Sequence, residues 1–332
     1  MQNQEGEEEF AVKITDTGDG VMEATSSIPS SDWANFRDDD IMQQHSAIRA
    51  YEADKIPFEP LSSLSAEYES GSPILLEKIK LIGEKYAAIR RTRGDGNCFF
   101  RSFMFSYLEH ILETQDRAEV DRVKANVERC RTTLQNLGYA DFTFEDFFAN
   151  TEFVETFILD ASGIELEFGK MLRFKRTTLW LFLEQLDNVL QGTEDSISHE
   201  ELVQRSRDQS VSDYVVMFFR FVTSGEIRKR SEFFEPFILG LTNATVEQFC
   251  KSSVEPMGEE SDHVHIIALS DALGVPIRVV YLDRSSCDKG GVSLNHHDFV
   301  PASEGTESSS KSSNPIITLL YRPGHYDILY PK

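Results

Sequence analysis

Three side chains of this sequence have the types that a thiol hydrolase needs. Cys98 follows the turn-forming residues Gly94-Asp95-Gly96-Asn97, while His325 and Asp327 lie within the last eight residues. A cysteine thiolate can attack a carbonyl carbon, an imidazole can take the thiol proton, and a carboxylate can orient the imidazole. The residue types therefore predict a nucleophile, a base and an orienting acid, provided that the fold brings the two segments together.

The residues around Cys98 predict a turn followed by a helix. Gly94 and Gly96 favour turn geometry, and from Phe99 to Leu112 apolar residues recur every three or four positions, as on a helix. Cys98 would then lie at the helix N-terminus, where unpaired N–H groups and the helix dipole favour a thiolate. The same N–H groups would point to where an oxyanion forms during attack on a carbonyl.

A second pattern, near the C-terminus, bears on whether Cys98 is a nucleophile. A lone free cysteine is more often a buried core residue, so the loop alone leaves both interpretations open. Residues 315–321 and 325–330 are predicted to be strands joined by a tight turn. On a strand His325 and Asp327 share a face, with Cα atoms about 6 to 7 Å apart, so the carboxylate can reach the imidazole. Without the thiol, a hairpin-capping histidine and a solvated aspartate would be the better interpretations.

Two longer motifs contain these residues, Thr92-Arg93-Gly94-Asp95-Gly96-Asn97-Cys98-Phe99-Phe100-Arg101-Ser102 and Tyr321-Arg322-Pro323-Gly324-His325-Tyr326-Asp327-Ile328-Leu329-Tyr330. They resemble the otubain branch of the ovarian-tumour-domain (OTU) deubiquitinases, and similar segments lie at 223–225, 231–234, 254–257 and 260–269. The similarity runs from about residue 43 to the end of the sequence. The resemblance implies a papain-like OTU fold of the α/β class, with a small, mostly antiparallel sheet flanked by helical regions. It also implies a cysteine isopeptidase that cuts ubiquitin from ubiquitin or from other proteins.

The resemblance assigns a role to each of four residues. Cys98 matches the family's nucleophile, His325 its general base and Asp327 the residue that orients the base. Asp95 matches the acidic residue of the family's Asp-Gly-Asn-Cys box, which is often grouped with the catalytic set. We expect the backbone of its loop, rather than its carboxylate, to act on the oxyanion.

Neither a metal nor a cofactor is expected, because the resembled family uses none. His263, His265 and the pair 296–297 suggest a metal site at first, but no thiol pair is adjacent and local hydrogen bonding explains them better. The cysteines at 98, 130, 250 and 287 lack C-x-x-C spacing and are expected to be free thiols in a reducing compartment. Because the sequence has no targeting pattern and no run of about eighteen apolar residues, we expect a cytoplasmic and also a nuclear location.

The net charge of −23 restricts the partners that this chain can bind. Such acidity disfavours nucleic-acid phosphates and anionic membranes. It would attract the arginines in the tail of ubiquitin, although acidity can also serve solubility alone. The expected partners are ubiquitin and polyubiquitin chains, with ubiquitin-conjugating enzymes as a further class, and the chain is expected to be a monomer. The basic cluster at 90–93 is predicted to be solvated and to anchor the nucleophile loop.

Composition divides the sequence into an arm and a domain. Residues 1–40 are acidic and poor in apolar residues, which predicts a disordered arm, and residues 41–332 form the predicted otubain-like catalytic domain. A weak helical pattern over 40–51 matches a helix that binds the proximal ubiquitin in the resembled family. The Ser- and Gly-rich stretch 284–314 is predicted to be a flexible insertion between two strands.

The region between the two motifs is predicted to be mainly helical as far as residue 221, with apolar stripes that pack the core. The phenylalanine-rich stretch 142–157 is assigned to that core rather than to a docking groove. Residues 223–236 mix charge, glycine and aromatic side chains, which favours a recognition loop. By resemblance, this loop and the stretch 236–262 would contact the distal ubiquitin.

Helix termini can be placed at two points of this region and its flanks. Ser72 and Pro73 are the residue types that cap and begin a helix. Asp262 has the type of an N-cap, and Gly274 that of the residue after a helix C-terminus. A strand over 276–282 is predicted to follow that second helix.

The favoured function is hydrolysis of the bond after ubiquitin's C-terminal Gly-Gly, with the degradation-tagging lysine linkage as the preference that the resemblance implies. A binding regulator is the alternative: it would hold ubiquitin and ubiquitin-charged conjugating enzymes without cutting. An acyltransferase or a protease for an unrelated substrate would need the same three residues but not the family-wide similarity. Covalent capture of Cys98 by a ubiquitin probe with a C-terminal electrophile separates the enzyme from the regulator.

Overall fold

The computed structural model describes part of the chain, in six stretches. These are residues 58–69, 72–139, 178–190, 196–284, 291–301 and 315–332. The chain divides into two units, Met1–Arg37 and Asp38–Lys332, and every described residue belongs to the second. The predicted arm over 1–40, the predicted helix over 40–51 and the stretch 142–157 lie outside the described residues.

The described strands form one six-stranded sheet. They are β1 (Phe58–Pro60), β2 (Tyr86–Arg90), β3 (Ile277–Tyr281), β4 (His296–Phe299), β5 (Ile317–Arg322) and β6 (His325–Pro331). Their order is β1-β2-β6-β5-β3-β4, and every neighbouring pair is antiparallel except β3 and β5. The predicted mostly antiparallel sheet is confirmed, and β6 lies inside it between β2 and β5.

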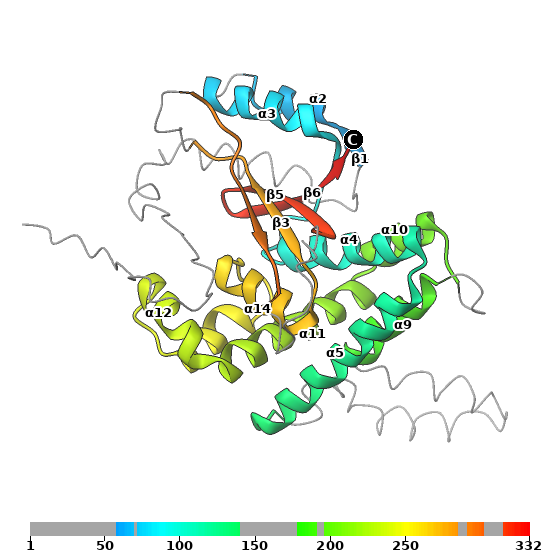
Figure 1. Ribbon diagram of the computed structural model, residues 1–332, viewed down its shortest axis with the longest axis vertical. Coiled ribbons are helices and arrows are strands. Elements are labelled where there is room, and N and C mark those ends of the chain that lie inside the picture. The colour runs from blue at the N-terminus through cyan, green and yellow to red at the C-terminus, as the bar shows by residue number, and fades with distance from the viewer. Residues whose placement is uncertain (1–57, 70–71, 140–177, 191–195, 285–290, 302–314) are drawn as a thin grey trace, which may run out of the picture. The chain divides into compact units, whose positions relative to one another are not determined.

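Helices cover both faces of this sheet (Figure 1). They are α2 (Leu61–Glu67), α3 (Pro73–Lys85), α4 (Cys98–Thr114), α5 (Arg117–Asn136), α9 (Thr178–Asn188), α10 (His199–Arg207), α11 (Gln209–Lys229), α12 (Ser231–Leu241), α13 (Val246–Phe249) and α14 (His263–Leu273), with a π-helical turn at Cys250–Val254. Helices α2 and α3 pack on one face, and α4, α11 and α14 belong to the core on the other. None of the described helices is long and apolar enough to cross a membrane.

The central strands are apolar on both faces because both faces are covered. Leu319 of β5 packs into the core that α4 and α11 line, while the next residue, Leu320, packs against α2 and α3. In β6, Ile328 likewise packs into the core with α4 and α11, and Leu329 packs into the core with α2 and α3. Successive side chains of a strand point to opposite faces, so this short apolar run joins two hydrophobic cores through the sheet.

The predicted helix termini are confirmed by the structure. Helix α3 begins at Pro73 after Ser72. Asp262 caps α14 by accepting hydrogen bonds from the N–H groups of the first turn, and Gly274 ends that helix in the left-handed conformation with φ +68°. These local signals place α14 directly before β3, as expected.

The hairpin that carries the C-terminal motif is also confirmed. Arg322 of β5 faces His325 of β6, so Pro323 and Gly324 alone make the turn. Pro323 has the fixed φ that suits the second position of a turn. Gly324 has φ +74°, a backbone conformation that residues other than glycine rarely adopt. His325 and Asp327 therefore begin β6 at the end of the sheet where the turn lies.

Two predictions about this region were wrong. Residues 223–236 are not a loop, because α11 continues to Lys229 and α12 begins at Ser231. Thr223 and Ser224, at the start of that stretch, are buried in α11: Thr223 donates to the carbonyl of Phe219 (2.7 Å) and Ser224 to Glu255 (2.7 Å). The stretch 284–314 also contains a strand, β4, which pairs with β3.

Candidate active site

Cys98 is the first residue of α4 and is buried, with 4% of its surface exposed. The turn before it is held by Asp95. One oxygen of that carboxylate accepts the N–H of Asn97 (3.0 Å), and the other accepts two N–H groups of Arg101 (2.6 and 2.9 Å) from the first turn of α4. The carboxylate of Asp95 therefore ties the turn to the helix that begins at Cys98.

The Asn97 side chain does not cap the N-terminus of α4. Its oxygen accepts hydrogen bonds from Arg220 (2.8 Å) and from the N–H of Gly258 (2.9 Å), and it makes no capping bond to the helix. The first helical bond runs from Arg101 N–H to the Asn97 carbonyl (3.0 Å). The N–H groups of the first turn therefore lack a side-chain cap, which suits them to bind an oxyanion.

Arg220 of α11 binds the turn that precedes Cys98. Its role in positioning this turn was not recognised in the sequence. It is fully buried, and its five hydrogen bonds to described residues all go to carbonyl or amide oxygens, among them those of Gly96 (3.1 Å) and Glu259 (2.7 Å). Burial lowers the pKa of Arg220 to about 10. The available signal was a single arginine inside the apolar run 215–222, since a buried guanidinium needs dedicated acceptors.

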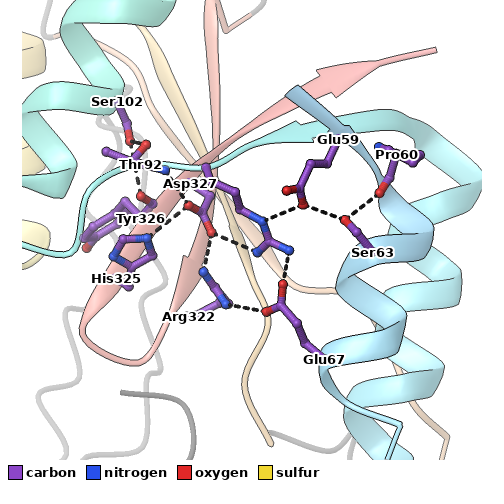
Figure 2. A network of polar contacts seen from close by, with 11 residues as sticks. Glu59, Pro60, Ser63, Glu67, Thr92, Ser102, Arg322, His325, Tyr326 and Asp327 are labelled. Atoms are coloured by element: carbon purple, nitrogen blue, oxygen red, sulfur yellow. Dashed lines mark hydrogen bonds and ion pairs between the residues drawn. The ribbon is translucent and has the colours of Figure 1, made fainter. Parts of the chain in front are cut away.

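His325 and Asp327 meet as their spacing predicts. Their side chains are 2% and 0% exposed, and His325 Nε2 lies 3.0 Å from Asp327 Oδ1 (Figure 2). The other ring nitrogen, Nδ1, is buried and has no hydrogen-bond partner among the described residues. The carboxylate thus fixes one nitrogen of the imidazole and leaves the other free to exchange a proton.

The charges around this pair favour an imidazolium beside an ionised carboxylate. Burial by itself lowers the pKa of His325, but the interactions with the Asp327 carboxylate and with Cys98 outweigh burial and raise the pKa to about 9. Burial also raises the pKa of Asp327, but Arg322 and His325 outweigh that effect and hold the pKa well below its usual range. The interaction with His325 shows that the structure brings Cys98, from α4, next to the imidazole on β6.

Two buried arginines support the second oxygen of Asp327. Arg322 Nη2 lies 2.5 Å and Arg91 Nη1 3.6 Å from Oδ2, while the N–H of Thr92 donates to Oδ1 (2.9 Å). The prediction that the cluster 90–93 is solvated is wrong for Arg90 and Arg91, which are 5% and 1% exposed. The cluster does anchor the segment before the nucleophile turn, through buried ion pairs.

Two of the four histidines considered as metal ligands, His263 and His265, make hydrogen bonds to nearby side chains. His265 Nδ1 lies 2.8 Å from Asp262 Oδ1, within the capping interactions of α14, and His263 Nε2 lies 2.7 Å from the hydroxyl of Tyr281. In the parts of the chain that the structure describes, no group of three or more His, Cys, Asp or Glu side chains is placed to hold a metal ion.

A thiol at a helix N-terminus, an imidazole on an adjoining sheet and a carboxylate that orients it are the arrangement of a papain-like cysteine hydrolase. The sequence pattern of the family Peptidase C65 Otubain matches residues 44–173 and 164–331. The chain belongs to this family of cysteine peptidases.

Individual relatives agree with the family match. The chain is 65% identical over 316 residues to an OVARIAN TUMOR DOMAIN-containing deubiquitinating enzyme 1 of Arabidopsis thaliana, covering 94% of this chain and 92% of that protein. It is 40% identical over 270 residues to ubiquitin thioesterase OTUB1 of Homo sapiens, covering 81% and 80%. Among solved structures it resembles a complex of ceOTUB1 with ubiquitin aldehyde and UBC13~Ub, with a TM-score of 0.65, 31% identity and 87% and 99% coverage. A related complex contains UBCH5B~Ub.

Proposed function

We propose that this chain is a deubiquitinating cysteine isopeptidase that hydrolyses the bond after the C-terminal Gly-Gly of ubiquitin. The observation that carries the proposal is the contact of His325 with Asp327, which leaves Nδ1 without a partner beside Cys98 at the open end of α4. The substrate comes from the relatives, which are named as deubiquitinating enzymes and ubiquitin thioesterases.

In the proposed mechanism the Cys98 sulfur attacks the carbonyl carbon of ubiquitin's terminal glycine. The proton of the Cys98 thiol passes to His325, a C–S bond forms, and the N–H groups at the start of α4 donate hydrogen bonds to the oxyanion. As the C–N bond breaks, His325 gives its proton to the leaving lysine amine. Water then attacks the thioester while His325 takes one of its protons, the C–S bond breaks, and that proton returns to the Cys98 sulfur as the free ubiquitin carboxylate leaves.

An exposed apolar surface supports a protein as substrate. Four apolar side chains of α12, which follows the helix that carries Arg220, are between 43% and 57% exposed: Phe233, Phe237, Leu239 and Leu241. Large apolar residues that gather on one exposed element mark protein contacts. We assign this face of α12 to the distal ubiquitin, whose tail enters the site.

A ubiquitin probe with a C-terminal electrophile tests the enzyme. Wild-type chain should form one covalent adduct, Cys98→Ala should form none, and Cys130→Ala, which changes a buried thiol on α5, should react as wild type does. A panel of di-ubiquitin linkages incubated with the same proteins then gives the linkage preference, for which we expect the degradation-tagging lysine linkage. Cleavage by folded Cys98→Ala at the wild-type rate would refute the proposal.

A second function is supported by the partners in the solved relatives. Those complexes contain the conjugates UBC13~Ub and UBCH5B~Ub. The chain could bind such conjugates and block ubiquitin transfer without cutting. This function predicts that Cys98→Ser still inhibits chain synthesis by a charged conjugating enzyme, and loss of inhibition in this variant would contradict it.

A further inference from the structure

The carboxylate of Asp327 belongs to a buried ion network that extends to the elements β1 and α2 (Figure 2). Arg322 lies between two carboxylates, 2.5 Å from Asp327 Oδ2 and 3.1 Å from Glu67 Oε2. Arg91 lies 3.6 Å from Asp327 Oδ2 and 3.3 Å from Glu59 Oε2, and it also contacts Glu67 Oε1. Glu67, at the end of α2, therefore holds both arginines that hold Asp327.

The network is balanced in charge and largely dry. The side chains of Arg91 and Arg322 are 1% exposed, and that of Glu67 is 13% exposed. Two guanidinium groups and the imidazolium of His325 face three carboxylates, those of Asp327, Glu67 and Glu59. A buried charge that loses its partner is strongly unfavourable. Without Glu67, Asp327 would be the one carboxylate of the network that Arg322 and Arg91 share, while Arg91 would keep Glu59 as well.

The network also divides the two oxygens of Asp327 between different tasks. Oδ2 faces Arg322 and Arg91, while Oδ1 faces His325 and the N–H of Thr92. The positions of Arg322 and Arg91 therefore set how the Asp327 carboxylate is rotated about its Cβ–Cγ bond. A shift of either guanidinium would turn Oδ1 away from the imidazole.

We propose that Glu67 is a positioning residue of the active site, which holds Arg322 and Arg91 so that Asp327 presents Oδ1 to His325. The inference rests on the proposed hydrolase function and gives β1 and α2, which precede both sequence motifs, a part in catalysis. It also names a source of the electrostatic balance around His325 that lies outside the three reacting residues.

In the described part of the chain, few other titratable groups lie near His325 and Asp327. Cys98 lies beside His325. The phenols of Tyr68, after α2, and Tyr326, on β6, also lie near, and burial raises the pKa of both, so that they stay neutral. Removing the charge of Glu67 is therefore not compensated by the ionisation of a neighbour.

The test is the titration of His325 in Glu67→Gln. In the full chain with labelled histidines, the His325 resonance is assigned by its loss in His325→Asn and followed by NMR against pH. We expect the midpoint to fall by about half a unit or more, because a negative charge is removed from the network. We also expect kcat on a ubiquitin substrate to fall by about three- to tenfold with KM nearly unchanged, because the carboxylate is misplaced.

Three further variants make the test specific. Glu67→Asp keeps the charge and should restore most of the midpoint. Glu59→Gln, which removes a contact of Arg91, should give a smaller downward shift. Glu77→Gln, an exposed carboxylate of α3 paired with Lys80, should behave as wild type.

A folded Glu67→Gln protein with the wild-type His325 midpoint overturns the inference. Should Glu67→Gln not fold, an unchanged midpoint in Glu59→Gln overturns it instead. If these shifts occur in the variants but the wild-type chain does not react with a ubiquitin probe, the hydrolase is refuted and the network stands, so the two failures are distinguishable.

Discussion

At the scale of single residues, the imidazole of His325 sets how the proposed reaction depends on pH. Its pKa of about 9 means that the ring keeps its proton at neutral pH, beside the carboxylate of Asp327. A histidine whose pKa is raised in the folded protein contributes stability that is complete below its unfolded pKa, about 6.5, and is lost as pH rises through the folded pKa. The ion pair of His325 with Asp327 is therefore lost as the pH rises through about 9.

We predict that kcat/KM on a fluorogenic ubiquitin substrate falls on the alkaline side with a midpoint near pH 9. Above that pH the leaving amine loses its proton donor. Initial rates across the alkaline range give the midpoint, and intrinsic fluorescence checks that the protein remains folded. An alkaline limb near the usual histidine pKa would contradict the role given to Asp327 and Cys98.

A second prediction at this scale separates two roles for Asp95. Its carboxylate accepts hydrogen bonds from the N–H of Asn97 and from the side chain of Arg101. Because Asp95→Asn keeps an acceptor for the Asn97 N–H, it should lower kcat by about tenfold or less. Asp95→Ala, which leaves that N–H without a partner, should cost about tenfold more. A loss of about 10² to 10³ in kcat for Asp95→Asn, the size expected when an oxyanion donor is removed, would contradict this supporting role.

Cys98, His325 and Asp327 were predictable because each lies in a short segment whose local pattern carries the signal. Their supporting residues were not. Glu67 and Arg322 are 255 positions apart, and nothing in either segment indicates the other. Ion pairs of this kind are created by the sheet, which brings the ends of the two segments together.

At the scale of elements, the nucleophile turn depends on a close approach of two backbones. Gly96 has φ +73°, and a Cβ there would lie 1.8 Å from the carbonyl oxygen of Gly258. Arg220 bonds to both segments, through Gly96 and Glu259. The turn before α4 and the segment before α14 are therefore packed as one unit.

We predict that Gly96→Ala lowers kcat by at least about 100-fold, because the turn must shift and a displacement of about 1 Å has an effect of this size. Gly83→Ala is the matched control. A Cβ at Gly83 meets nothing within 4 Å, so this change in α3 should stabilise the fold by about 0.5 to 1 kcal/mol and leave kcat unchanged. Thermal unfolding and steady-state kinetics measure both, and normal kcat in Gly96→Ala would refute the tight packing.

The exposed face of α12 gives a prediction about binding. Phe237→Ser should raise KM for ubiquitin substrates several-fold while kcat stays within about twofold, because the side chain binds substrate and does not reach the reacting atoms. Val300→Ser removes an apolar residue that is equally exposed elsewhere and should change neither constant. A normal KM for folded Phe237→Ser would exclude this face from the ubiquitin site.

Elements with strong local signals were predicted, and elements fixed by tertiary contacts were not. Pro323 and Gly324 mark the hairpin β5–β6, Asp262 and Gly274 mark the two ends of α14, and the glycines of the preceding turn mark the start of α4. The continuation of α11 through Thr223 and Ser224 depends on partners such as Glu255, which the sequence around them does not reveal. Strand β4 has only four residues, His-His-Asp-Phe, and pairs with β3 alone as the edge of the sheet.

At the scale of the whole molecule, the net charge of −23 should assist encounter with the basic tail of ubiquitin. We predict that kcat/KM falls several-fold when NaCl rises from about 0.02 M to about 0.3 M, because salt screens attraction between exposed charges. Alkylation of Cys98 by uncharged iodoacetamide should change by less than about twofold over the same range. A salt-independent kcat/KM would show that the acidity serves another purpose.

The position of β6 between β2 and β5 also has a consequence for how the protein is made. The pairing of β2 with β6 joins residues about 240 positions apart, and such non-local contacts form late in folding. Translation yields the segment with the thiol early and the strand with its base last, so a growing polypeptide on the ribosome has a gap in the middle of its sheet. We therefore expect the growing chain to gain hydrolytic capacity only when synthesis has passed β6.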